Sequence, residues 1–187
     1  MKYSKQLWIV VFFVGVLTPQ FSFTQCSIFK SEIKDVQEYM NQVAQLTDSL
    51  STSLEIASFD ANSRNARKNA NIAKKLLGEA VNIAYDASEK MEEAFYYSEQ
   101  CGTKDVLSNT IASERQTVDT RNVIDEAFEN AKKGITANTL GNLQYYMRIT
   151  QRLLRNVKDS AEQAAYFADM AHYSCEHNED QVFGSNK

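Results

Sequence analysis

The chain has 187 residues, 43% of them hydrophobic and 24% charged, with a formal net charge of −4. This length suffices for one hydrophobic core, and the acidic balance argues against nucleic-acid binding, which needs a basic surface. The only proline, Pro19, stands near the start, so the rest of the chain has no residue that interrupts long helices. We therefore expect an all-α protein.

The first 24 residues have the pattern of a cleaved signal peptide. Lys2 and Lys5 precede an apolar run at 7–17, which is shorter than the about 20 residues that a membrane-spanning helix requires. We expect cleavage after residue 24 and export, to the periplasm or outside the cell. Acylation of Cys26 and an uncleaved membrane anchor are the alternatives.

Removal of residues 1–24 takes two of the 20 basic residues and none of the 24 acidic ones, so the mature chain would carry a net charge of −6. We expect no membrane span in it. Acidic residues gather in the segments near the cysteines, and basic residues gather toward the opposite ends of the predicted helices. This separation either orients the protein against an anionic partner or surface, or reflects ordinary solvated helix faces.

Three segments repeat small or apolar residues in alternating steps of three and four, the pattern of a coiled-coil seam. The first seam runs through Cys26, Phe29, Ile33, Val36, Met40, Val43, Thr47, Leu50, Leu54 and Ala57. The second runs through Ala66, Ala70, Ala73, Leu77, Ala80, Ala84, Ala87, Met91, Ala94, Ser98 and Cys101. The last runs through Leu140, Leu143, Met147, Thr150, Leu154, Val157, Ala161, Ala164, Ala168, Ala171 and Cys175.

The segment between the second and the last seam is less regular. Its apolar residues fall on two lines displaced by one residue, first Leu107, Ile111 and Val118, then Ile124, Phe128, Ala131 and Ile135. Glu114 interrupts the first line. We expect a local change of helix winding or a partly exposed stretch near this residue.

Short connections separate the four predicted helices. Gly102 can end the second helix and Thr103 can cap the third, which Gly134 is expected to end. Connections this short make neighbouring helices antiparallel. The sequence thus predicts an up-down-up-down four-helix bundle over residues 25–177, with a flexible tail at 178–187.

Cys101 and Cys175 lie 74 residues apart, and the same offset relates positions of the second seam to positions of the last one. A duplicated helical hairpin would explain this offset. Four helices of one bundle also share a heptad phase for packing reasons alone, so both explanations remain open.

The three cysteines, Cys26, Cys101 and Cys175, fall on seams that the topology brings to one end of the bundle. An exported chain meets oxidants, so a disulfide bond is the expected use of two of them. The alanine-rich seams of the second and fourth helices should pinch the bundle and bring Cys101 close to Cys175, the pair that we expect to be bridged. Cys26 paired with either of the others is the alternative. The third thiol would stay reduced or link two copies of the chain.

The same end of the bundle offers a second interpretation, a metal site. His172 and His177, the only histidines, flank Cys175, and with Cys26 and Cys101 they form a set of ligands suited to zinc or copper. None of the usual ligand spacings, such as CxxC or HExxH, is present. Histidines near a helix end are also commonly solvated, and we expect no cofactor.

Three aromatic doublets are candidates for an interface: Tyr96 with Tyr97, Tyr145 with Tyr146, and Tyr166 with Phe167. Adjacent helical residues point about 100° apart, so both rings of a doublet cannot lie on one seam. The rings either cover the edges of the core or face a partner.

No nucleophile motif such as GxSxG is present, and two histidines near one terminus leave little for general-base chemistry. We therefore expect no enzyme. The sequence favours an exported, non-catalytic helical bundle that acts as a binding or structural module for an unknown protein partner or as a homodimer. The alternative is a metal or cofactor carrier that uses the Cys/His cluster at one end.

Overall fold

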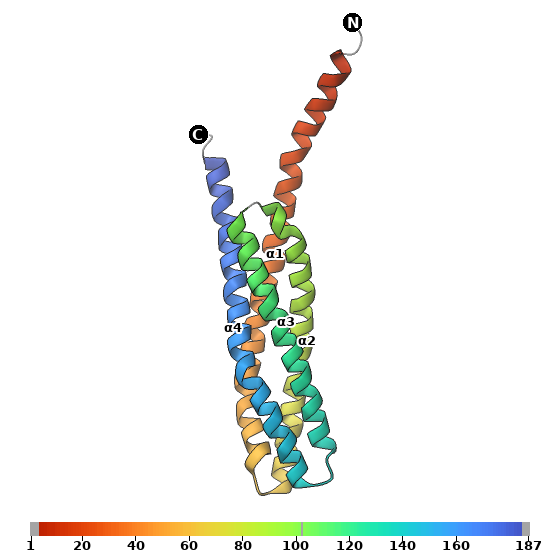
Figure 1. Cartoon of the computed structure of the whole chain (residues 1–187), viewed down its shortest axis with the longest axis vertical. Helices are drawn as coiled ribbons and strands as arrows, with labels where there is room; N and C mark the ends of the chain where they lie inside the picture. Colours follow the sequence, from red (N-terminus) through yellow and green to blue (C-terminus); the bar gives the residue numbers. More distant parts are fainter. Residues whose placement is uncertain (1–3, 102, 185–187) are drawn as a thin grey trace.

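The computed structural model describes the backbone of residues 4–101 and 103–184, and the side chains of residues 25–101 and 103–177. Its elements are α1 (Ser4–Phe59), α2 (Ser63–Ser98), the short 3₁₀ helix η1 (Glu99–Cys101), α3 (Lys104–Thr136) and α4 (Leu140–Gly184). Each of α1 and α3 packs against both α2 and α4, so α1 and α3 lie on one diagonal and α2 and α4 on the other (Figure 1). This arrangement confirms the antiparallel four-helix bundle.

Two predicted segments, the signal peptide at 1–24 and the tail at 178–187, fall outside the residues whose side chains are described. The last helix, α4, runs to Gly184 and so includes most of the predicted tail. Across the described residues, none of the helices combines the length and the apolar character needed to cross a bilayer.

Side-chain caps explain where α2 and α3 begin. The Asn62 side chain accepts hydrogen bonds from the backbone N–H groups of Arg64 and Asn65 at the start of α2. Thr103 caps α3 as predicted, accepting from the N–H of Val106 at 3.3 Å. The expected role of Gly102 cannot be compared with the structure, because this residue lies outside the described part.

The seams predicted for the first and second helices are buried at every residue. The last seam is buried as well, apart from Leu140, which is partly buried at the start of α4. Helix packing therefore follows the alternating steps of three and four that were read from the sequence.

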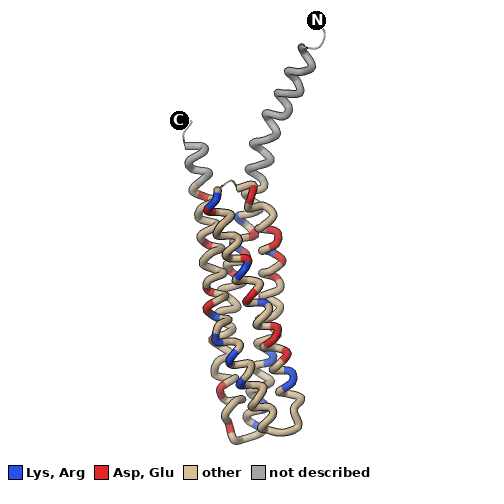
Figure 2. The backbone as a smooth tube through the Cα atoms, in the orientation of Figure 1, with Lys and Arg blue, Asp and Glu red and all other residues tan. Residues whose placement is uncertain are grey.

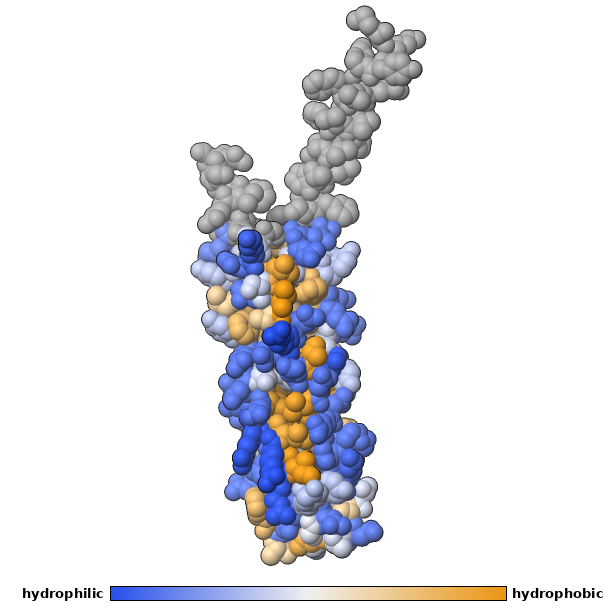
Figure 3. All heavy atoms as spheres, in the orientation of Figure 1, coloured by the Kyte–Doolittle hydropathy of each residue, from blue (hydrophilic) through white to orange (hydrophobic). Residues whose placement is uncertain are grey.

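The apolar lines predicted for the third helix do not coincide with its core face, although the partly exposed stretch expected near Glu114 is observed. Ile111 is 44% exposed and Leu107 is only partly buried, whereas the core face is polar there. The buried seam of α3 runs through Val106, Thr110, Ser113, Thr117, Thr120, Ile124, Ala127, Ala131 and Gly134. Its steps alternate between four and three without a break, so no shift of the apolar line is needed near Glu114. Hydrophobic residues are visible along the face of the molecule on which α3 lies (Figure 3).

Two of the four hydroxyl groups on this seam have carbonyl partners, whereas those of Thr117 and Thr120 have none among the described residues. Thr110 Oγ1 donates to Val106 O at 2.7 Å within α3, and Ser113 Oγ donates to Ala164 O of α4 at 2.9 Å. Burial of a hydroxyl group costs the protein little stability when the group is hydrogen-bonded, and more when it is not. Small side chains also let α3 approach α4 closely.

Gly134 lies inside α3 and does not end it, contrary to the sequence-based expectation. A Cβ atom built at this position would overlap Met147 Cε of α4 and come within 3.1 Å of Tyr146 Cβ. The residue is thus glycine because the two helices meet closely, and α3 continues for two residues to Thr136.

We call the two ends of the bundle the cysteine end and the loop end. The cysteine end is where α2 passes into α3, and the loop end holds the α1–α2 and α3–α4 connections (Figure 1). Basic residues are more frequent toward the loop end, as Figure 2 shows. Across the diagonals, α2 and α4 approach each other more closely than α1 and α3 do, in agreement with their alanine-rich seams.

Candidate functional site

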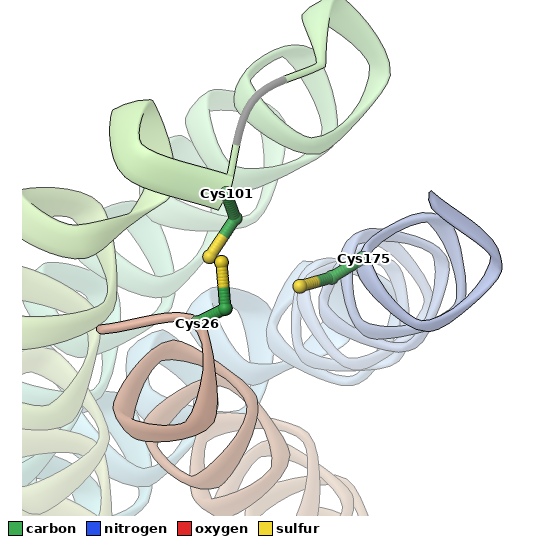
Figure 4. A group of neighbouring side chains, drawn as sticks. All are labelled: Cys26, Cys101 and Cys175. Atoms are coloured by element: carbon green, nitrogen blue, oxygen red, sulfur yellow. The ribbon is translucent and has the colours of Figure 1, made fainter. Parts of the chain in front are cut away.

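The three cysteines meet at the cysteine end of the bundle. Cys26 comes from α1, Cys101 closes η1 after α2, and Cys175 lies on α4 (Figure 4). Their Sγ atoms all lie within 4.8 Å of one another. Their exposed fractions are 8%, 6% and 1%, so the cluster is buried. Three seams that run the length of the bundle therefore end at one common point.

All three cysteines carry thiol groups in the structure, and among the described residues no disulfide bond is formed. The predicted bridge between Cys101 and Cys175 is consequently not part of this structure, although the two thiols are neighbours. Bridging of this pair, or of Cys26 with either partner, remains a prediction about the protein in an oxidising compartment.

Neighbouring thiols and burial affect the protonation of Cys101. The Cys26 thiol lies 3.7 Å from Gln100 O and donates to it. Contact with the Cys175 thiol, burial, and contact with the Cys26 thiol together raise the pKa of Cys101 well above its ordinary value. A thiol with a raised pKa is a weak nucleophile, so Cys101 is poorly suited to nucleophilic attack.

The two histidines lie outside the thiol cluster. His172 Nδ1 is 3.9 Å from Glu176 Oε2, and His177 Nδ1 is 3.0 Å from Tyr173 O. The His177 ring also packs on the Tyr173 ring, with centroids 3.8 Å apart. Among the described residues, the group that could hold a metal ion consists of the three cysteines alone.

Each aromatic doublet is divided between water and the core. The first ring is exposed, with fractions of 68% for Tyr96, 56% for Tyr145 and 59% for Tyr166, while the second ring is partly buried. The two rings of each doublet meet edge to face, with centroids 5.0, 5.4 and 5.5 Å apart. The inner ring thus covers the edge of the core and holds the outer ring in a fixed position.

Two of the doublets lie in shallow hollows with carboxylate groups. The first hollow, which we call the α2 hollow, has a volume of about 480 Å³ and is lined by Ile28, Glu92, Glu93, Tyr96 and Tyr97. The second, which we call the α4 hollow, has a volume of about 430 Å³ and is lined by Asp159, Glu162, Gln163, Tyr166 and Phe167. Both contain two aromatic rings and two carboxylates, so they offer the same chemistry.

A repeat in the sequence could have identified these hollows together. Glu92, Tyr96 and Tyr97 are each followed 70 residues later by Glu162, Tyr166 and Phe167. Seventy residues are ten heptads, so the offset also keeps the position relative to the seam. This repeat is hidden when the two halves of the sequence are aligned on Cys101 and Cys175, because an offset of 74 residues does not place Tyr96 opposite Tyr166.

Beside each hollow lies a lysine that forms an ion pair with an acidic residue of α1. Lys90 Nζ is 2.8 Å from Glu32 of α1 and 3.5 Å from Glu93 of the α2 hollow. Lys158 Nζ is 2.8 Å from Asp48 of α1 and 3.9 Å from Glu162 of the α4 hollow. Hydrogen bonding to Glu32 is the main reason that the pKa of Lys90 is raised. The lysines are thus held mainly by α1, and the carboxylates of the hollows stay about half exposed, 50% for Glu93 and 54% for Glu162.

The third doublet, Tyr145 with Tyr146, lies toward the loop end. On the same helix it is followed by Arg148 and Arg152, so its surroundings are basic. Its ring geometry and exposure match those of the other two doublets, whereas its charge is opposite. It can therefore serve as a control for an aromatic pair without neighbouring carboxylates.

No protein-family model matches this chain, and no curated protein sequence matches it significantly.

Proposed function

We propose that the protein is an exported, non-catalytic binding module that holds a cationic segment of a partner protein in the α2 and α4 hollows. The observation that carries this proposal is the repetition of one chemistry, two rings with two carboxylates, in hollows on two different helices. Lysine and arginine are the side chains that suit such a surface. Their charged heads are attracted to carboxylates and to the faces of tyrosine rings.

The arrangement of the hollows supports a binding role. Tyrosine contributes a large ring with few rotatable bonds, so little conformational entropy is lost when a partner covers it. The carboxylates of Glu93 and Glu162 are held weakly by lysines that prefer acids of α1, so a partner cation can displace the intramolecular contact. Ion pairs at such exposed positions give selectivity and fast association more than affinity.

Peptide binding tests this proposal. The probe is a fluorescein-labelled peptide with alternating lysine and glycine, and its binding is followed by fluorescence anisotropy at low and at high salt. We expect binding that weakens with salt, because the contacts are between exposed charges. The double variant Tyr96→Ala/Tyr166→Ala should bind about tenfold to 100-fold more weakly, in the range of residues that dominate interfaces.

Tyr145→Ala is the matched control, since this ring has the same exposure and geometry in a basic environment. It should change peptide affinity by less than about twofold. Equal effects of the control and of the double variant would contradict the proposal. A dimer that forms without peptide and is lost in the double variant would assign the hollows to a second copy of the chain.

Export and a disulfide bond belong to the same proposal. We expect the mature protein to begin at Gln25 and to have a Cys101–Cys175 bridge when it is isolated from an oxidising compartment. Intact mass spectrometry after alkylation of the remaining thiol reports both features, since a bridge lowers the mass by two hydrogen atoms. A mature protein that begins at a lipid-modified Cys26, or that alkylates at all three cysteines, would contradict this part.

A further inference from the structure

Beyond this proposed function, we propose that the reduced cysteine cluster binds one soft metal ion, monovalent copper, through the Sγ atoms of Cys26, Cys101 and Cys175. The inference rests on the meeting of three buried thiols from three separate helices and does not depend on the two hollows.

The distances between the sulfur atoms suit a single ion with three ligands. An ion with bonds of about 2.3 Å to three sulfur atoms in a plane holds those atoms about 4 Å apart. The three Sγ atoms already lie within 4.8 Å of one another, and their side chains point toward a common centre (Figure 4). Small side-chain rotations that move each Sγ atom by less than about 1 Å would therefore complete the site.

The number and type of ligands select the ion. Structural zinc almost always takes four protein ligands, and the described residues offer three thiols with no histidine among them. Burial limits access of the water that would complete a tetrahedral zinc site. Thiolates are soft ligands that favour Cu(I), which does not require a fourth ligand.

The surrounding helices hold the ligands in place before the ion arrives. Cys175 lies on the continuous helix α4, and Cys101 is the last residue of η1, which extends α2. Cys26 is oriented by its contact with Gln100 O, which belongs to the residue before Cys101. Preformed sites of this kind lose little conformational entropy on binding.

Binding exchanges protons and leaves the oxidation states unchanged. Each thiol that becomes a ligand releases its proton to water, and a metal–sulfur bond replaces the sulfur–hydrogen bond. Copper enters and remains as Cu(I), so no oxidant is required. A disulfide bond between any two of the cysteines would remove two of the three ligands, so the bridged and the metal-bound forms exclude each other.

Competition with a chromogenic chelator tests the proposal. The purified protein is reduced, kept anaerobic and titrated into Cu(I) held by bathocuproine disulfonate, whose colour reports the copper that it retains. We expect the protein to withdraw one Cu(I) per chain and its Tm to rise, because the ion binds the folded state. Failure to withdraw copper, or no saturation at one ion per chain, would overturn the proposal.

Single substitutions identify the ligands. Cys26→Ser, Cys101→Ser and Cys175→Ser should each weaken Cu(I) binding by more than about 100-fold, which exceeds the usual effect of losing a group outside the coordination shell. The matched control, His172→Asn/His177→Asn, should stay within about threefold. A histidine variant that loses copper as strongly as the cysteine variants would show that the ligand set is a different one.

X-ray absorption at the copper edge keeps the test decisive even if a cysteine variant does not fold. The spectrum of the unaltered protein should show three sulfur neighbours at about 2.3 Å and no nitrogen neighbour. Two sulfur neighbours, or a shell that includes nitrogen, would overturn the three-sulfur site. Displacement of the bound Cu(I) by an equal concentration of zinc, seen as copper that returns to the coloured chelator, would overturn the assignment to copper.

Discussion

The cysteine end and the loop end of the bundle are filled by different kinds of side chain. At the loop end the helices bury large apolar residues, such as Leu54 of α1, Leu77 of α2 and Met147 of α4. Near the cysteines, α2 and α4 bury mainly alanine and α3 buries threonine and serine. The large buried side chains there are Phe29 and Ile33 of α1 and Met91 of α2.

The loop end therefore contributes more to stability, whereas the candidate binding sites lie toward the cysteine end. Large apolar side chains contribute most of the burial energy, so the loop end carries more of it per turn. The cluster of thiols and both acidic hollows lie toward the cysteine end, where less apolar volume is buried. Binding sites are commonly found in such regions of lower local stability.

The largest expected effect tests how far the cysteine end depends on α1. Phe29→Ala should lower the free energy of unfolding by about 3–5 kcal/mol, because the small neighbours of Phe29 cannot close the cavity. Leu54→Ala at the loop end is the comparison, with an expected loss of about 2–5 kcal/mol. Chemical denaturation measures both values, and hydrogen exchange should show that the opening caused by Phe29→Ala is confined to the cysteine end. A loss below about 1 kcal/mol for Phe29→Ala would contradict this description of the core.

Close packing at the loop end gives the next effect. Gly134→Ala should cost up to about 1 kcal/mol, because Met147 Cε can move away but Tyr146 Cβ, 3.1 Å from the added methyl group, requires the helices to shift, which outweighs the gain in helix propensity. Gly141→Ala is the control, since nothing lies within 4 Å of a Cβ atom there. This control should be neutral or stabilise by up to about 1 kcal/mol through helix propensity. Thermal unfolding measures both, and a Gly134→Ala variant as stable as Gly141→Ala would mean that Met147 and the backbone at Tyr146 adjust without cost.

Hydroxyl groups in the α3 seam allow a test of similar size. Ser113→Ala removes the hydrogen bond to Ala164 O and should cost about 0.5–1.5 kcal/mol. Thr117→Val keeps the shape of a hydroxyl that has no partner among the described residues, so it should be neutral or stabilising. If Thr117→Val destabilises more than Ser113→Ala in urea denaturation, the Thr117 hydroxyl has a partner that the described contacts do not include.

The smallest expected effect concerns the turn between α1 and α2. The pKa of Asp60 is lowered by hydrogen bonds from the Asn62 backbone and the Asn65 side chain. A lowered pKa in the folded state means that the contribution of Asp60 is present above its unfolded pKa and is lost as pH falls through the folded value. Asp60→Asn should therefore lower Tm slightly at pH 7 and leave it unchanged near pH 2. A Tm difference that persists at pH 2 would point to a role other than charge.

Most of the fold could be predicted because three of the helices use apolar seams. The seams of α1, α2 and α4 were visible as alternating steps of alanine, leucine and other apolar residues. The seam of α3 was missed because threonine and serine fill it, and an analysis of hydrophobic periodicity cannot see buried hydroxyl groups. The carbonyl partners of Thr110 and Ser113 lie on α3 and on α4, and such contacts are known only once the helices are in place.

The candidate sites were predictable in part for a related reason. Seam positions indicated that the three cysteines would lie at one end, and their contact follows from the packing of continuous helices. Heptad position could not tell whether the two histidines would join them, because side-chain direction near a helix end depends on local contacts such as that of His177 with Tyr173. The paired hollows required the carboxylates and the rings to be seen on one surface.

Arg67 and Gln144 close the loop end with hydrogen bonds to backbone carbonyl groups. Arg67 of α2 donates to Ala137 O at 3.0 Å, and Gln144 of α4 donates to Asp60 O at 2.9 Å. Neither contact responds to reductants, oxidants or thiol-binding reagents, since no sulfur takes part. A change of redox conditions would thus alter the contacts between helices at the cysteine end and leave those at the loop end unchanged. A spectroscopic label at the cysteine end would then report the redox state, and a label at the loop end would serve as its internal reference in the same molecule.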